Sequence, residues 1–180
     1  MTIGLPFPEV LRAARSGADW AWERLVASIA APLRGYVAAQ GAVDPDELVG
    51  QVLLQLVQGI ERFEGDEAGF RSWVFVIAHH RVIDERRRQR RQTALQARQA
   101  PAADAPPADA GLDASATIDW PQRLRVLSED QRHVILLRVV AGLSAEEVAR
   151  ILGKRVGTIR VLQHRGLARL RAELGAGVTR

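Results

Sequence analysis

The N-terminal part of the chain places apolar residues at the three- and four-residue spacing of amphipathic helices. The earliest run comprises Trp20, Trp22, Leu25, Val26 and Ile29. Pro32 is expected to kink or restart this helix, because proline lacks the amide hydrogen that a helix interior uses. The pattern therefore predicts an all-helical N-terminal region.

A second helix is predicted to begin at Asp44-Pro45, because aspartate can cap the free amides and proline suits the first turn. Asp46 and Glu47 then face the positive end of the helix dipole. Almost two apolar faces follow, formed by Leu48, Val49, Val52, Leu53, Leu56, Val57 and Ile60. Either the helix lies at the centre of the bundle, which is the default interpretation, or one stripe packs in the core and the other binds a partner.

The stretch FRSWVFVIAHHRVIDERRRQRR, residues 70–91, predicts a third helix after a polar loop at residues 64–69. Its first half is apolar and its end is a run of arginines. The helix dipole stabilises each terminal arginine by at most about 1 kcal/mol, which hardly requires five of them. A row of phosphates would explain them, because each neutralised phosphate releases a counterion. A solvated helix end is the alternative.

Residues 100–116, APAADAPPADAGLDASA, cannot bury enough apolar surface to offset their ordering entropy and are predicted to form a flexible linker. The chain has a net charge of +4, distributed as −4 over residues 1–80, +5 over 81–98, −4 over 99–122 and +7 over 123–180. Genome composition can explain arginine in place of lysine, but not this clustering. Two basic zones beside an acidic spacer indicate two contacts with a polyanion.

Two capping boxes mark helix starts in the C-terminal part. Ser128 pairs with Gln131 and Ser144 with Glu147, so that each side chain can satisfy a free amide of the first turn. The helix after Ser144 is expected to end at Gly153, a good C-cap residue. A short helix, a glycine-bearing turn and then a basic helix form the helix-turn-helix pattern.

The last helix, from about residue 156 to residue 174, has the features of a DNA-reading helix. Thr158 and the free amides of the first turn can hold a phosphate. Basic side chains follow at helical spacing, and Val161 can touch a thymine methyl group. A bundle helix with a solvated arginine face is the alternative. The prediction is an all-α fold with two small helical bundles, residues 1–91 and 120–180, joined by a linker at residues 92–119.

Several kinds of chemistry are excluded by composition. The chain contains no cysteine, which removes disulfides, zinc–thiolate sites and cysteine nucleophiles and fits an intracellular protein. No apolar run approaches the roughly 18 residues that span a membrane, and the N-terminus lacks a signal-peptide pattern. His80 and Asp84 could pair, but two ligands do not make a metal site. No metal, cofactor or enzymatic activity is expected.

These motifs together resemble the extracytoplasmic-function (ECF) sigma factors, the sigma-70-type initiation subunits of bacterial RNA polymerase. The resemblance extends from about Trp20 to Leu174, apart from the linker. DELVGQV, residues 46–52, is similar to the polymerase-binding helix of region 2, and residues 70–84 are similar to its promoter-melting and −10-recognition helix. Residues 127–174, including GLSAEEVARILGKRVGTIRVLQHRGLARLRAEL, are similar to region 4, which reads the −35 element.

The resemblance implies three sets of site residues. Core polymerase would be bound by Asp46, Glu47, Leu48, Val49, Gln51, Val52 and Gln55. The −10 element would be contacted by Gly65, Asp66, Val76, Ile77, His79, His80, Arg81, Asp84, Arg86, Arg87 and Arg88. The −35 element would be contacted by Lys154, Arg155, Thr158, Arg160, Val161, His164 and Arg165. The loop at residues 65–69 would trap a flipped base, and its contacts would offset the cost of unstacking.

The implied partners are the β and β′ subunits of core RNA polymerase, promoter DNA and an anti-sigma factor. The free protein would be a cytoplasmic monomer. Three departures limit what the resemblance implies. Val76 and Ile77 stand where primary sigma factors carry a tryptophan wedge, which is usual for the ECF group. His80 replaces a common asparagine, and residues 161–163 differ from the common triplet. Weaker promoter melting and a −35 sequence of its own are expected.

Two other functions fit the same patterns. A helix-turn-helix regulator would form a homodimer and bind a palindromic site without polymerase. A helical adaptor that binds only protein would show no salt-dependent affinity for DNA.

Overall fold

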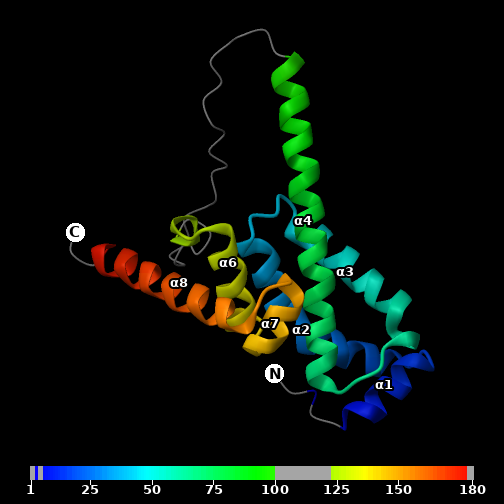
Figure 1. The fold of residues 1–180 in the computed structure, drawn as a ribbon. Coiled ribbons are helices and arrows are strands. Elements are labelled where there is room, and N and C mark those ends of the chain that lie inside the picture. The colour runs from blue at the N-terminus through cyan, green and yellow to red at the C-terminus, as the bar shows by residue number, and fades with distance from the viewer. Residues whose placement is uncertain (1–2, 4–5, 100–122, 178–180) are drawn as a thin grey trace.

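The computed structural model describes Ile3, residues 6–99 and residues 123–177. Over these residues the chain is helical and contains no strand, which confirms the predicted fold class (Figure 1). The elements are α1 (Phe7–Arg15), α2 (Asp19–Ala39), α3 (Pro45–Gly59), η1 (Ile60–Arg62), α4 (Glu67–Gln99), η2 (Leu124–Val126), α6 (Glu129–Ile135), η3 (Leu136–Val140), α7 (Ala145–Leu152) and α8 (Val156–Gly177). No helix among them is both long and apolar enough to cross a membrane.

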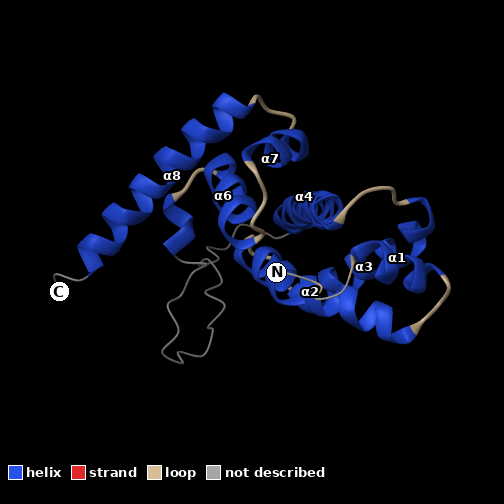
Figure 2. Cartoon of the chain, turned by 90° about the horizontal axis from the view of Figure 1, so that it is seen from below, coloured by secondary structure: helices blue, strands red, loops and turns tan. Residues whose placement is uncertain are grey.

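Helices α1 to α4 pack together on one side of the molecule (Figure 2). At the start of α4, Phe70 lies in an aromatic cluster with Phe7, Phe63 and Trp73, at ring-centroid distances of 5.7, 5.7 and 6.2 Å. Leu25, Ile29 and Leu33 of α2, together with Val52 and Leu56 of α3, continue this core toward the other end of the bundle.

Helix α2 passes through Pro32 without restarting, so the restart that the sequence allowed does not occur. Proline removes one backbone hydrogen bond from the helix interior. Ile29 and Leu33 lie on either side of it, however, and both are fully buried, as are Tyr36 and Val37 in the next turn. Burial of these four side chains outweighs the local cost, so the helix remains continuous to Ala39.

Helix α3 packs most of its apolar residues inward. Leu48, Val52 and Leu56 are buried, and Val49 and Leu53 are half-buried and pack against the core. Leu54 and Val57, by contrast, are 60% and 52% exposed. The default interpretation, a helix at the centre of the bundle, therefore agrees with most of the apolar positions, and Leu54 and Val57 leave a small apolar surface open to a partner.

The capping predictions for the C-terminal helices are confirmed. Ser128 with Gln131 and Ser144 with Glu147 form complete capping boxes at the starts of α6 and α7. Gly153 ends α7 in the left-handed conformation, with φ of 62°. The helix that begins after Ser128 is short, because α6 changes at Leu136 into the π-helical turn η3.

Helix α4 is the longest element and continues past Arg91 to Gln99, so residues 92–99, which the sequence placed in the linker, are helical. Its last turns project beyond the other helices (Figure 1). Residues 100–122, the rest of the predicted linker, lie outside the described residues.

Helices α6 to α8 pack against the α1–α4 bundle. Turn η3 contacts α2, and α7 contacts α4. Gly35 of α2 faces Val140 of η3 so closely that a β-carbon there would stand 3.5 Å from the valine Cγ1. One continuous set of buried apolar residues runs through both groups of helices. We call this arrangement the closed form.

Candidate nucleic-acid interface

Helix α4 directs adjacent candidate residues to opposite sides. Ile77 is buried at 5% exposure and belongs to the core, while Val76 is half-buried. His79 is buried and its Nδ1 lies 3.2 Å from the hydroxyl of Tyr36. His80 is exposed, as expected for neighbours on a helix. Of these four candidates on α4, His80 alone is exposed to solvent.

Two further candidates on α4 lie near α3 and solvent. Arg81 donates hydrogen bonds from Nε and Nη2 to Oε1 of Gln55, at 3.1 and 2.9 Å. Asp84 is exposed and lies 3.9 Å from the guanidinium of Arg87. The Arg81–Gln55 contact joins a candidate −10 residue to a candidate polymerase-binding residue.

The arginine run divides into inward and outward side chains. The Arg86 side chain is only 17% exposed, and its Nη2 donates to the backbone oxygen and Oε1 of Gln40 at 2.7 and 2.8 Å. Its Nη1 donates to Oε1 of Glu129 on α6 at 3.0 Å. Arg87 and Arg88, by contrast, are 69% and 68% exposed. In the closed form, Arg86 joins the helical groups, and Arg87 and Arg88 offer charge to solvent.

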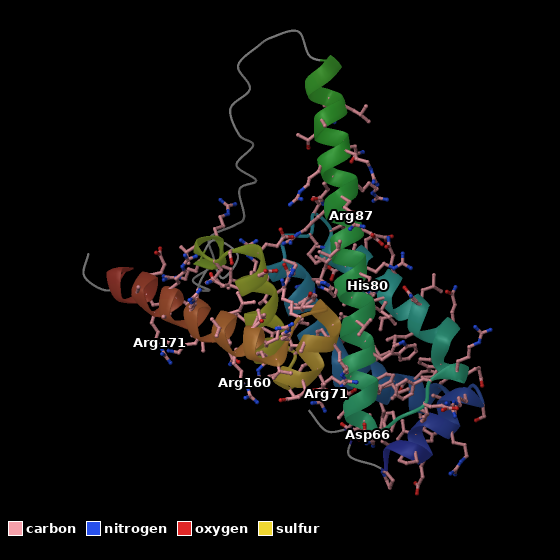
Figure 3. The ribbon with its side chains drawn as sticks, viewed as in Figure 1. Asp66, Arg71, His80, Arg87, Arg160 and Arg171 are labelled. Atoms are coloured by element: carbon pink, nitrogen blue, oxygen red, sulfur yellow. The ribbon has the colours of Figure 1, made fainter. Side chains whose placement is uncertain are left out.

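The loop before α4 is fixed by a cap. Oδ1 of Asp66 accepts a hydrogen bond from the amide of Gly69 at 2.8 Å. Gly65 has φ of 152°, and a β-carbon there would stand 3.0 Å from the ring of Phe63, so glycine suits this turn. Both Gly65 and Asp66 are exposed. Asp66 lies at the start of α4, and Arg87 lies farther along the helix (Figure 3).

Helix α8 has a buried face and a basic face. Ile159 and Leu170 are buried, whereas Thr158, Arg160, Val161, His164 and Arg165 are exposed. Arg160 lies 3.3 Å from Glu146 of α7, and both side chains are mostly exposed, so the pair contributes little to stability. Arg160 and Arg171 point away from the rest of the molecule on one side of α8 (Figure 3).

The two basic residues between α7 and α8 differ in their contacts. Nζ of Lys154 lies 2.9 Å from Oδ2 of Asp130 on α6, whereas Arg155 is exposed. The −35 candidates thus lie in the turn before α8 and along its first ten residues, with Lys154 turned toward α6.

The polymerase-binding candidates on α3 are of two kinds. Leu48 and Val52 are core residues, and Val49 is half-buried. Asp46 lies at the surface, where a hydrogen bond from Arg34 at 2.7 Å lowers the pKa of its carboxyl. Gln51 donates to Glu47 at 2.9 Å. The exposed apolar pair Leu54 and Val57 was not among the candidates, although the second apolar stripe that the sequence indicated for α3 was a signal that could have found Val57.

Contacts between α4 and α6 were not predicted from the sequence. The rings of His79 and His133 meet edge to face, with centroids 4.9 Å apart. Burial lowers the pKa of His79 to about 4 and that of His133 to about 3. A cavity of about 780 Å³ opens beside Arg86 between α4 and α6. Among the described residues, no three histidine, aspartate or glutamate side chains cluster in a way that could hold a metal ion.

Comparison with known families identifies the chain. Sigma-70 region 2 matches residues 21–92, and sigma-70 region 4 matches residues 119–170. These ranges place α2 to α4 in region 2 and α6, α7 and most of α8 in region 4.

Curated relatives point to the same family. The ECF RNA polymerase sigma factor SigD of Mycobacterium tuberculosis is 34% identical over 140 residues, which cover 76% of this chain and 66% of SigD. The ECF RNA polymerase sigma factor ShbA of Streptomyces griseus is 34% identical over 71% of this chain and 70% of ShbA. The RNA polymerase sigma factor CarQ of Myxococcus xanthus is 32% identical over 89% of this chain and 93% of CarQ. The chain belongs to the ECF sigma factors of the sigma-70 family.

Solved structures share the fold. CnrH, in complex with the cytosolic domain of CnrY, has a TM-score of 0.66 and 24% identity, covering 94% of this chain and 97% of CnrH. The sigma factor RpoE of Bartonella quintana, in complex with the anti-sigma factor NepR, has the same TM-score and identity over 88% of this chain and 98% of RpoE. The resemblance that the sequence motifs suggested is thereby confirmed at the level of family and fold.

Proposed function

We propose that this chain binds core RNA polymerase and directs transcription initiation from specific promoters. Region 2 recognises and melts the −10 element through α4, and region 4 reads the −35 element through α8. The observation that carries this proposal is the pair of basic helices in a sigma-70 chain, each offering arginines to solvent: Arg87 and Arg88 on α4, and Arg160 and Arg165 on α8. The protein acts by binding rather than by catalysis, in the cytoplasm, where polymerase and promoter DNA are found.

Promoter binding requires the closed form to open. Helix α6 covers His79, and Glu129 neutralises Arg86, so two of the −10 candidates are turned toward region 4. Separation of α6 to α8 from α2 and α4 releases both side chains toward DNA. The free protein is a monomer in the closed form, and core polymerase stabilises the open one.

The exposed apolar pair Leu54 and Val57 is the core-binding face of α3 in this proposal. Replacing both with aspartate places charge on that face and is expected to abolish binding to core polymerase while leaving the fold intact, because neither side chain is in the hydrophobic core. Leu95→Asp is the matched control, since Leu95 is a 55% exposed leucine on α4. Equal binding by all three proteins in a size-resolved assay would contradict this placement of the interface.

An anti-sigma factor is a second proposed partner. The solved structure of RpoE contains the anti-sigma factor NepR, and the exposed pair Leu54 and Val57 on α3 offers such a protein an apolar surface here.

The outward arginines of α4 are expected to bind phosphates without reading sequence. Arg87→Ala with Arg88→Ala should weaken promoter binding almost equally for all promoters, and should reduce the slope of log affinity against log salt by about 0.9 for each phosphate that is no longer neutralised. The measurement is a salt titration of promoter binding by the polymerase complex. Arg12→Ala with Arg62→Ala removes two exposed charges elsewhere in the α1–α4 bundle and serves as the control. A loss confined to certain promoter sequences would instead indicate base contacts.

A further inference from the structure

The contact between regions 2 and 4 contains two buried histidines. His79 of α4 and His133 of α6 are 9% and 4% exposed, and their rings cross at 88°. Each side chain is contributed by a different region of the protein. Both imidazoles must therefore be desolvated each time region 4 closes onto region 2.

The hydrogen-bond partner of His133 requires a neutral ring. Nη1 of Arg86 lies 3.4 Å from Nε2 of His133. A guanidinium only donates hydrogen bonds, so Nε2 must accept and cannot carry a proton. Protonation of His133 would make Nε2 a hydrogen-bond donor. It would then face another donor, Nη1 of Arg86, and the permanent positive charge of that guanidinium.

The carboxylates near the histidines are already paired. The charged and titratable groups that face the pair are Tyr36 from α2, His80 and Arg86 from α4, Glu129, Asp130 and Arg132 from α6, and Lys154 from the turn after α7. Glu129 is bound by Arg86 at 3.0 Å, and Asp130 by Lys154 at 2.9 Å. Among these groups, an imidazolium in the interface would thus find three cations and no free anion.

We propose that proton uptake by His79 and His133 opens the closed form, so that the interface between α4 and α6 is an acid-sensitive latch. The opening itself depends only on this interface. Its effect on transcription, through exposure of the −10 candidates of α4, rests on the function proposed above.

The direction of the effect follows from linkage. Both histidines have a lower pKa in the closed form, about 4 and about 3, than the value of about 6.5 for a solvated histidine. The closed form therefore binds fewer protons, and its advantage is complete above about pH 6.5 and is lost progressively below it. At pH 5.5 each histidine shifts the equilibrium about tenfold toward the open form, so the ratio of open to closed molecules should rise roughly 100-fold from pH 7.5 to pH 5.5.

The chain lacks cysteine, so two introduced cysteines can carry a fluorescent donor and acceptor. Glu61→Cys in η1 and Arg171→Cys in α8 are at exposed positions and lie outside the latch. Single-molecule energy transfer counts open and closed molecules separately, and circular dichroism at each pH reports whether the helices persist. The expected result is a rise in open molecules between pH 7.5 and pH 5.5 with the helical signal unchanged.

The chain has four histidines, which provide matched variants. His79→Gln with His133→Gln should remove the pH response, whereas His80→Gln with His164→Gln, at two exposed positions, should retain it. An unchanged ratio in the parent protein, equal acid opening in the His79/His133 variant, or opening only with loss of the helical signal would each overturn the latch. The readout uses no polymerase or DNA, so failure to bind core would refute the proposed function and leave this inference standing.

Discussion

Replacing Phe70 with alanine is expected to lower the free energy of unfolding by about 3–5 kcal/mol. Phe70 is 1% exposed and contacts three other aromatic rings where α1, η1 and α4 meet. Alanine would leave a cavity at the N-terminal end of α4, the helix that carries most of the −10 candidates. A loss of this size is a large part of the stability of a small protein, so a substantial unfolded fraction is expected at moderate temperature.

Urea denaturation followed by circular dichroism measures this effect. Leu95→Ala is the matched control, because it also shortens an apolar side chain of α4, at an exposed position. The control should change the free energy of unfolding by less than about 0.5 kcal/mol. Equal effects of the two substitutions would show that Phe70 is not a core residue.

Removing two arginines from α8 is the functional change with the largest expected effect. Arg160 and Arg165 of α8 are exposed, whereas Ile159 and Leu170 of the same helix are buried. Each is expected to contribute about 1–3 kcal/mol to binding of the −35 element, so Arg160→Ala with Arg165→Ala should weaken binding by at least roughly 30-fold. The fold should persist, since neither side chain is buried.

Footprinting of the polymerase complex on promoter DNA gives the test, with protection of the −35 element as the readout. The variant Arg12→Ala with Arg62→Ala removes the same charge from the α1–α4 bundle and should retain protection there. An unchanged −35 footprint in the α8 variant would show that other residues read this element.

Local signals in the sequence were sufficient to place the C-terminal helices. The capping boxes at Ser128 and Ser144 and the C-cap at Gly153 involve residues at most a few positions apart, so each could be read from its own short segment. The outward position of Arg160 followed from the same helical periodicity.

Contacts between distant residues could not be read in this way. Nothing in the sequence near His133 indicates that its ring meets His79, because that contact depends on how region 4 packs against region 2. The inward turn of Arg86 has the same cause, since its partners Gln40 and Glu129 lie at the end of α2 and on α6. Only tertiary packing explains why the Arg86 side chain is largely buried while that of its neighbour Arg87 is exposed.

Helix boundaries and exposed faces were predicted less well where packing overrides local preference. Pro32 lies inside a continuous helix because its neighbours are buried. Leu54 was overlooked because it lies outside both apolar stripes that the sequence pattern indicated for α3, and exposure rather than sequence reveals it.

The central claim is that this chain directs core RNA polymerase to promoters. The most direct test mixes the purified protein with purified bacterial core RNA polymerase, resolves the complex by size, and follows with run-off transcription from genomic fragments. We expect the protein to join core and the complex to start transcription at discrete sites, whose mapping would give the −10 and −35 sequences. A protein that ignores core polymerase yet shifts DNA alone as a dimer would contradict the claim and indicate a conventional helix-turn-helix regulator.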